Sequence, residues 1–191
     1  MRRDADACGR IAVLVMLAAI VSCAADDVYF EPNMDFGSLR SVAVLPFQNL
    51  TSVDEAAERV RDTFMGMLLA TGAVYVLPPG EVARGISKIG RIPLEGPSTE
   101  QVKQLSNVLQ IDSVITGVVR EYGTVRSGAT SANVVSISLQ MIEVKSGMVV
   151  WSASSTRGGV TLWDRLIGGG GEPMDTVTVR AVNDLLDKLF D

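Results

Sequence analysis

The chain has 191 residues, of which 47% are hydrophobic and 5% aromatic, and its formal net charge is −5. This length and composition indicate one folded domain with an aliphatic core, and they exclude a disordered chain. An acidic chain without a basic stripe repels phosphate backbones, so nucleic acid is not expected among its partners. The chain has two cysteines and no histidine. The usual zinc sites and the nucleophiles that depend on histidine are therefore excluded.

The N-terminus has the pattern of a bacterial lipoprotein signal peptide. After a basic start, Ile11–Val21 is an uninterrupted apolar run that is too short to cross a bilayer as a helix. The run ends in Ile20-Val21-Ser22-Cys23, which resembles the lipobox that precedes the acylated cysteine of bacterial lipoproteins. We therefore expect a signal peptide over residues 1–22 and a lipid on Cys23. The alternative is an ordinary secretory signal with a chance cysteine.

The residue after the acylated cysteine bears on which membrane holds the protein. Several acyl chains on Cys23 would give stable anchoring. Ala24 follows, whereas an Asp in that position retains lipoproteins at the inner membrane in enterobacterial-type sorting. We therefore expect the periplasmic face of the outer membrane, with the inner membrane left open. Residues 23–38 show no sustained period and are interpreted as a lipid-anchored tether.

Residues 39–191 are predicted to form a single α/β domain. Ser41–Phe47 suits a buried first strand. Ser52–Glu55 has a capping-box pattern, and an amphipathic helix follows it as far as Gly72. The residues expected to face inward are Val53, Ala56, Ala57, Val60, Phe64, Met67 and Leu68. Val74–Leu77 is a short second strand, so the domain is expected to start with a parallel βαβ unit.

The rest of the domain alternates between helical and strand patterns. Further elements are expected over Glu81–Ile89 (helix), Thr99–Gln110 (helix capped by Ser98), Ser113–Tyr122, Asn133–Val144 and Met148–Ser155 (strands), and about Asp175–Phe190 (helix). Inward positions on the two later helices are Val102, Leu105, Val108 and Leu109, then Val179, Val182, Leu185, Leu186 and Leu189. The predicted fold is a mixed sheet of about five strands, with a β-hairpin and a C-terminal helix packed on it.

Glycines and tryptophans mark the candidate sites in the last third of the chain. Gly168–Gly171 is followed by Glu172 and Pro173, which a phosphate loop would not have, so a hinge is favoured over a phosphate site. Trp151 lies in the middle of a strand and is interpreted as a core residue. Trp163 lies in a glycine-bounded loop, where apolar residues either fold back on the core or contact a membrane or partner. Contact is expected for Leu162, Trp163, Leu166 and Ile167.

No set of residues in the sequence suggests catalysis. The carboxylates show no pairing pattern typical of acid–base chemistry, and those of the first amphipathic helix fall on its solvent side. We therefore expect a protein that is not an enzyme and that needs no cofactor and no metal.

Three stretches carry a resemblance to a known family. They are Val42–Leu50 before the amphipathic helix, Asp112–Tyr122, and Val135–Ser154 with its strand-turn-strand ending in Trp-Ser-Ala-Ser. In this order and spacing they resemble the outer-membrane lipoproteins related to CsgG, PelC and the amino-terminal domain of TolB. The resemblance implies a non-enzymatic protein that forms oligomers, often rings, and assists the export of polysaccharide or protein subunits. In the PelC branch a tryptophan after this hairpin enters the membrane. Trp163 is the candidate by position, although its spacing from Trp151 departs from that pattern.

Two functions remain open on this basis. The first is an oligomeric envelope scaffold for export or assembly of a surface polymer or protein. The second is a lipoprotein regulator of a peptidoglycan synthase resembling LpoB, whose domain must reach through the cell wall on a long tether. The expected tether of residues 23–38 is short, which favours the scaffold.

Overall fold

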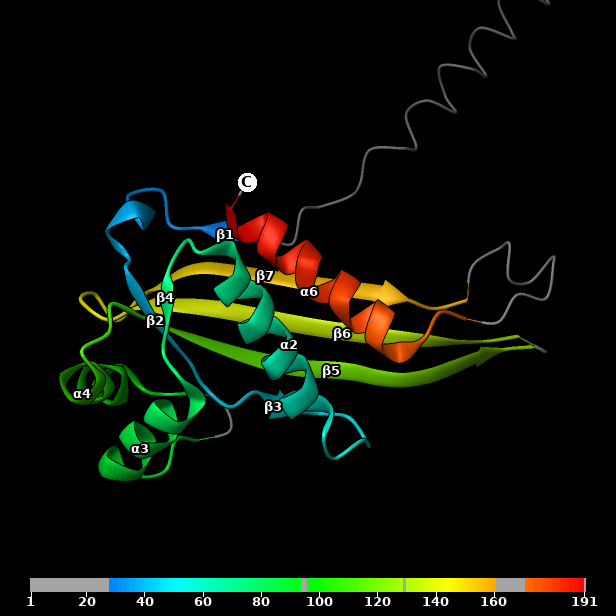
Figure 1. The fold of residues 1–191 in the computed structure, drawn as a ribbon, viewed down its shortest axis with the longest axis horizontal. Helices are drawn as coiled ribbons and strands as arrows, with labels where there is room; N and C mark the ends of the chain where they lie inside the picture. The colour runs from blue at the N-terminus through cyan, green and yellow to red at the C-terminus, as the bar shows by residue number, and fades with distance from the viewer. Residues whose placement is uncertain (1–27, 94–95, 129, 161–170, 191) are drawn as a thin grey trace, which may run out of the picture.

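The structure is a computed structural model that describes residues 28–93, 96–128, 130–160 and 171–190. Its centre is one mixed sheet of seven strands, with the order β1-β7-β6-β5-β2-β4 and with β3 paired to β5 (Figure 1). The predicted fold class is confirmed, although the sheet has more strands than the expected five. The additional strands are the short β1 (Val28–Phe30) and β3 (Gln48–Asn49).

The first half of the domain is the predicted βαβ unit. Strand β2 (Ser41–Val44) and strand β4 (Tyr75–Val76) are parallel and are connected by helix α2 (Ala56–Thr71). Strand β2 also pairs in parallel with β5 (Ser113–Ser127) and lies inside the sheet. The position of β2 explains its run of apolar residues, because a strand inside such a sheet is buried on both faces.

The second half is an antiparallel meander of long strands. Strand β5 pairs with β6 (Thr130–Glu143), and β6 pairs with β7 (Val149–Gly158). Both β5 and β6 extend beyond their predicted bounds at the hairpin between them. The β5–β6 register shifts between Val119 and Glu121, where Arg120 forms a bulge.

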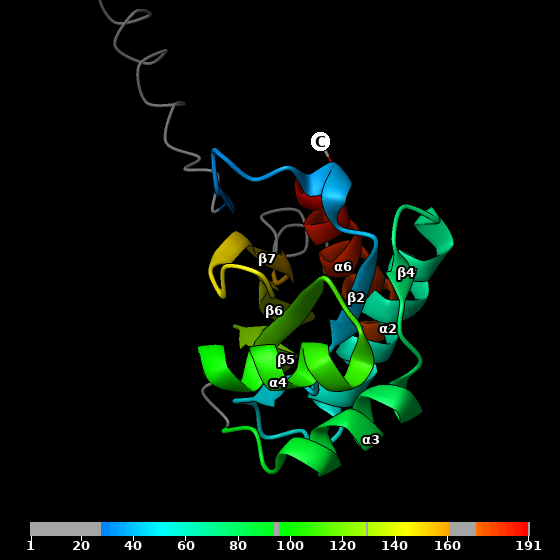
Figure 2. The ribbon, with the colours of Figure 1, turned by 90° about the vertical axis from the view of Figure 1, so that its left-hand side faces the viewer.

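Helices form layers on both faces of the sheet (Figures 1 and 2). Helix α2 and the C-terminal helix α6 (Met174–Phe190) cover one face and bury the larger core. Helix α3 (Pro79–Ile89) and helix α4 (Thr99–Leu109) cover only one end of the other face, over β2 and the start of β5. Trp151 is fully buried under α6, which confirms its interpretation as a core residue.

The start of α2 differs from the prediction. The N-cap is Glu55, which makes no side-chain cap hydrogen bond, so the expected capping box at Ser52 is wrong. Asn49 holds this turn instead: its Nδ2 donates to the carbonyl of Val53 at 2.7 Å, and its Oδ1 accepts from the Thr51 hydroxyl at 2.8 Å. Val53 is therefore part of the turn and is 39% exposed rather than inward.

Two other inward assignments are also wrong. Val179 on α6 is 46% exposed and Val108 on α4 is 37% exposed. On α6 the buried face is rotated by a fraction of a turn and includes Val177, Thr178 and Ala181. The predicted cap of α4 is confirmed, because the Ser98 hydroxyl accepts from the Gln101 backbone in a complete capping box.

The segment expected to be only a tether contributes to the fold. Strand β1 pairs antiparallel with β7, with Val28 opposite Ala153 and Phe30 opposite Trp151. A 3-10 turn over Phe36–Ser38 then leads into β2. In the described residues the sheet begins at Val28, which lies only a few residues after Cys23 in the sequence.

Candidate functional site

The face of the sheet opposite α2 and α6 is polar beyond the end that α3 and α4 cover. We call this part the open face. Because side chains alternate along a strand, the residues between the core positions of the meander point to this face. The polar residues of the open face are Thr116, Arg120, Ser136, Ser138, Gln140, Ser152, Ser154 and Thr156. Gln140, Arg120 and Thr156 are exposed.

Side-chain hydrogen bonds cross the open face from strand to strand. The Nε of Arg120 donates to the Ser138 hydroxyl at 3.1 Å, and Ser138 shares a 2.8 Å hydrogen bond with Ser154. Ser136 and Thr156 form a second pair at 2.9 Å. These bonds hold Arg120 over β6 and leave its remaining N–H groups available to a ligand or a partner.

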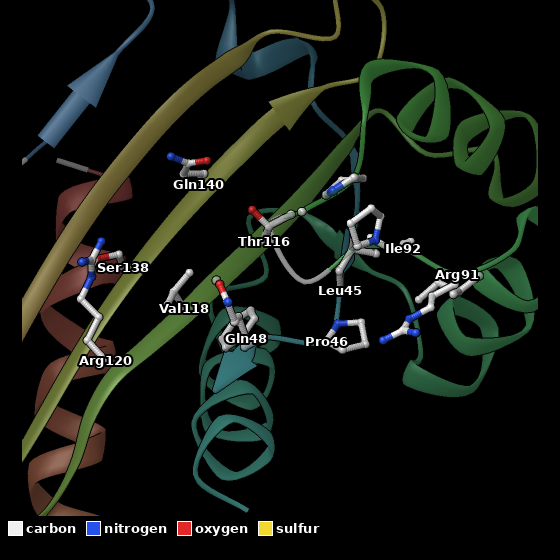
Figure 3. A pocket seen from close by; sticks show the side chains of 16 residues that line it. Leu45, Pro46, Gln48, Arg91, Ile92, Thr116, Val118, Arg120, Ser138 and Gln140 are labelled. Carbon is white, nitrogen blue, oxygen red and sulfur yellow. Dashed lines mark hydrogen bonds between the residues drawn. The ribbon is translucent and has the colours of Figure 1, made fainter. Parts of the chain in front are cut away.

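A groove of about 400 Å³ lies where the layer formed by α3 and α4 ends on the open face (Figure 3). Its polar lining consists of Gln48, Arg91, Thr116, Arg120, Ser138 and Gln140. Pro46, Ile92 and Val118 contribute apolar surface between these groups. The described lining therefore includes two guanidinium groups and no carboxylate, although the chain as a whole is acidic.

Gly117 allows the strands beneath the groove to pack closely. A Cβ at this position would lie 2.6 Å from Cδ2 of Leu139 and 2.7 Å from Cδ1 of Phe47. Phe47 is buried against the larger core and also lines the groove. The floor of the groove is thus fixed by core packing.

The chemistry of the groove suits non-covalent binding. Guanidinium, amide and hydroxyl groups form hydrogen bonds to carbonyl, hydroxyl or carboxylate groups. Among the described lining residues no base lies beside Thr116 or Ser138 to activate a hydroxyl nucleophile. Within the described part of the chain, no group of three His, Cys, Asp or Glu residues is arranged to hold a metal ion.

Two carboxylates with lowered pKa values are structural groups away from the groove. Burial raises the pKa of Asp112, but hydrogen bonds from the backbone of Arg40 and from Ser41 outweigh that effect and hold the pKa below its ordinary value. Burial also raises the pKa of Asp184, but the neighbouring Ser155 hydroxyl and the charges of Lys188 and Arg157 outweigh that effect and lower the pKa. Both carboxylates join elements of the fold, since Asp184 forms ion pairs with Lys188 on α6 and with Arg157 on β7.

The site residues predicted from the sequence lie outside the described residues. These are Cys23 and the loop residues Leu162, Trp163, Leu166 and Ile167. The structure describes the positions at which their segments join the fold, which are Val28 for the first and Val160 and Gly171 for the loop. The groove was not predicted, although Ser136, Ser138 and Gln140 alternate with apolar residues along the sequence of β6, which is typical of a strand with one polar face.

The chain forms a single mixed α/β domain with a polar groove, and comparison with known proteins identifies its family. The profile of the family described as "Putative lipoprotein GNA1162-like" matches residues 35–184. The chain therefore belongs to the GNA1162-like lipoprotein family. No curated protein sequence matches it.

Solved structures show the same fold at low sequence identity. The PelC dodecamer from Paraburkholderia phytofirmans is 19% identical with a TM-score of 0.56, covering 84% of this chain and 95% of that chain. Lipoprotein GNA1162 from Neisseria meningitidis is 17% identical with a TM-score of 0.55, covering 78% and 97%. Escherichia coli LpoB, at 12% identity and a TM-score of 0.48 over 62% and 57%, is too distant to bear on function. The resemblance to PelC is confirmed for the fold, and that to CsgG and TolB stays a prediction.

Proposed function

We propose that this protein is a non-enzymatic lipoprotein, anchored through Cys23, that forms an oligomer supporting export or assembly of a surface polymer or protein. The observation that carries the proposal is membership of a lipoprotein family over residues 35–184, together with a lipobox-like sequence before Cys23. Ala24 after that cysteine favours the periplasmic face of the outer membrane. Trp163 remains a candidate contact with the membrane or a neighbouring subunit.

The shared fold with a dodecameric protein supports the oligomer. In our proposal the open face and its groove contact the neighbouring copy. The open face and the layer of α2 and α6 are opposite sides of the domain. A contact between unlike faces is head-to-tail, and it closes into a ring when the rotation between copies allows it.

The short link to the anchor argues against the regulator of a peptidoglycan synthase. Only residues 24–27 separate Cys23 from the first strand. The Cα atoms of Cys23 and Val28 can then be at most about 17 Å apart, because an extended chain spans about 3.5 Å per residue. A domain held so close to its own membrane cannot cross the cell wall.

Native mass spectrometry of the detergent-extracted, lipidated protein tests the oligomer and the surface proposed for it. We expect an oligomer that Arg120→Glu weakens, because the variant places a carboxylate in the groove and removes the bond to Ser138. The control is Arg126→Glu, an equal charge change at an exposed position near the far end of β5. A wild-type protein that is monomeric at all concentrations contradicts the oligomer. Equal effects of the two variants contradict the use of the groove.

A further inference from the structure

Strand β1 exposes two aromatic side chains at one edge of the sheet. Tyr29 is 46% exposed and Phe30 is 39% exposed, and they point to opposite faces of the strand. Phe30 packs edge-to-face on Phe36 with ring centroids 5.6 Å apart. The edge strand therefore exposes one aromatic ring on each face, and the ring of Phe30 is held in place by its contact with Phe36. We call Tyr29 and Phe30 the β1 edge.

The end of the last helix lies beside the β1 edge. Trp151 is the cross-strand partner of Phe30, and its indole N–H donates to the carbonyl of Lys188 at 3.1 Å. Phe190, two residues later, is 49% exposed. In Figure 1 the C-terminus is drawn close to β1, and in Figure 2 it lies over the 3-10 turn that follows β1. A third exposed aromatic residue thus lies at the end of α6, two residues after the carbonyl that Trp151 contacts.

The lipid anchor proposed on Cys23 favours a membrane surface as the partner of the β1 edge. The chain enters the fold at Val28, immediately before the β1 edge. The reach of residues 24–27 places Val28 within about 17 Å of an acylated Cys23. Aromatic side chains are favoured in the interfacial region of a bilayer, where an apolar ring and a polar hydroxyl are both accommodated.

We propose that the β1 edge, with Phe190, rests in the interfacial layer of a zwitterionic phospholipid membrane and fixes the orientation of the domain. This inference depends on the anchoring at Cys23 in the proposed function. The lipid is zwitterionic because the charged residues that follow the β1 edge in the chain are acidic: Glu31 accepts a 2.7 Å hydrogen bond from the Tyr29 hydroxyl, and Asp35 begins the turn that carries Phe36. The charge of Lys188, near the end of α6, is paired with Asp184. Such carboxylates disfavour an anionic surface at low salt.

The opposite edge of the same sheet supplies a matched control. Tyr75 lies in the edge strand β4 and is 60% exposed. With the strand order β1-β7-β6-β5-β2-β4, the two edges are separated by five strand spacings. At about 4.8 Å per spacing this amounts to about 24 Å. If the β1 edge faces the membrane and Tyr29 lies in its interface, Tyr75 at the opposite edge is held away from the membrane, in water.

The test places a fluorophore at each edge of the full lipidated protein. Tyr29→Cys and Tyr75→Cys are labelled with an environment-sensitive dye after reconstitution into phosphatidylcholine–phosphatidylethanolamine vesicles. A nitroxide-bearing phosphatidylcholine quenches from the lipid side, and iodide quenches from water. We expect lipid quenching to be severalfold stronger at position 29 than at position 75, and iodide quenching to be stronger at position 75.

Every other outcome overturns the inference. A dye at position 29 that iodide reaches and the lipid quencher does not means that the β1 edge faces water. A dye at position 29 that neither quencher reaches means that a second copy or a protein partner covers it. The mass of the Cys23 peptide from the same sample separates the two proposals: an unmodified Cys23 contradicts both, whereas a lipidated protein with equal quenching at the two positions contradicts only this one.

Discussion

The Ser41 hydroxyl and Asp112 are joined by two hydrogen bonds of opposite direction. The hydroxyl donates to the Asp112 carboxylate at 3.0 Å and accepts from the Asp112 backbone N–H at 3.1 Å. The same carboxylate oxygen accepts from the backbone N–H groups of Arg40 and Ser41, each at 3.0 Å. One carboxylate therefore fixes the start of β2 against the start of β5, where Val42 pairs with Ser113.

Asp112→Asn tests this link. The lowered pKa means that the carboxylate stabilises the fold above the unfolded value, near pH 4, and loses this effect as the pH falls through the folded pKa. We expect the variant to lower the free energy of unfolding at pH 7 by about 1–3 kcal/mol, as for a hydrogen-bonded charge. In urea titrations the difference from wild type should be largest at pH 7 and should shrink at acid pH, as the carboxylate becomes protonated. Asp54→Asn, at an exposed position, is the control, and an equal loss at pH 7 and at acid pH contradicts the account.

Trp151 is expected to stabilise the contact between α6 and the sheet. The Lys188 carbonyl is in the last turn of α6, where helix carbonyls generally need a partner from outside the helix, and the indole N–H donates to it. Trp151→Ala should cost about 3–5 kcal/mol of stability, as for a buried aromatic residue. Trp151→Phe should cost less but remain destabilising, because it leaves that carbonyl unpaired. Thermal unfolding measures both, and a neutral Phe variant would show that the hydrogen bond contributes nothing.

Gly117 is expected to be required for packing rather than for backbone conformation. Gly117→Ala places a methyl group against Leu139 and Phe47, and overpacking of this kind costs about 1–3 kcal/mol. Gly66→Ala is the matched control, since a Cβ there has no heavy atom within 4 Å and Gly66 is an exposed position of helix α2. That variant should gain about 0.5–1 kcal/mol from helix propensity. Urea unfolding of both variants should thus give opposite signs, and equal signs would refute the packing argument.

Trp163 remains a prediction from the sequence. If it contacts a membrane or a neighbouring subunit, Trp163→Ala should change the thermal stability of the soluble domain lacking Cys23 by no more than about 1 kcal/mol. It should also reduce vesicle binding or oligomer size. A loss of about 3 kcal/mol or more would instead identify a core residue of its own domain.

The longer helices and strands could be predicted because their apolar residues repeat at helical or strand spacing over enough positions to be recognised. Strand β2 is a buried apolar run, and α2 and α4 repeat apolar residues at helical spacing. Strand β1 has only three residues, so it has no period, and its pairing with β7 depends on tertiary contacts. The rotation of α6 could not be predicted either, because Val177 and Val179 are equally apolar and only the sheet beneath the helix selects between them.

The groove could be predicted only in part. The alternation of Ser136, Ser138 and Gln140 indicates a polar face, and the structure confirms it. The sequence does not show that α3 and α4 leave this face uncovered, or that Arg91 and Arg120 line one cavity. Both features depend on packing between segments that are distant in the sequence. The predicted capping box at the start of α2 was wrong because the Asn49 side chain, which precedes it in the sequence, forms the hydrogen bonds that hold this turn.

In our proposal, Cys23 carries the lipid that holds this domain at its membrane. Mass spectrometry of the N-terminal peptide of the protein isolated from envelopes tests it most directly, with Cys23→Ser as the control. We predict a peptide that begins at Cys23 and carries a diacylglyceryl group, together with palmitate incorporation that the Ser variant loses along with its membrane fraction. A mature protein that begins at another residue, or one with an unmodified Cys23, would contradict the account.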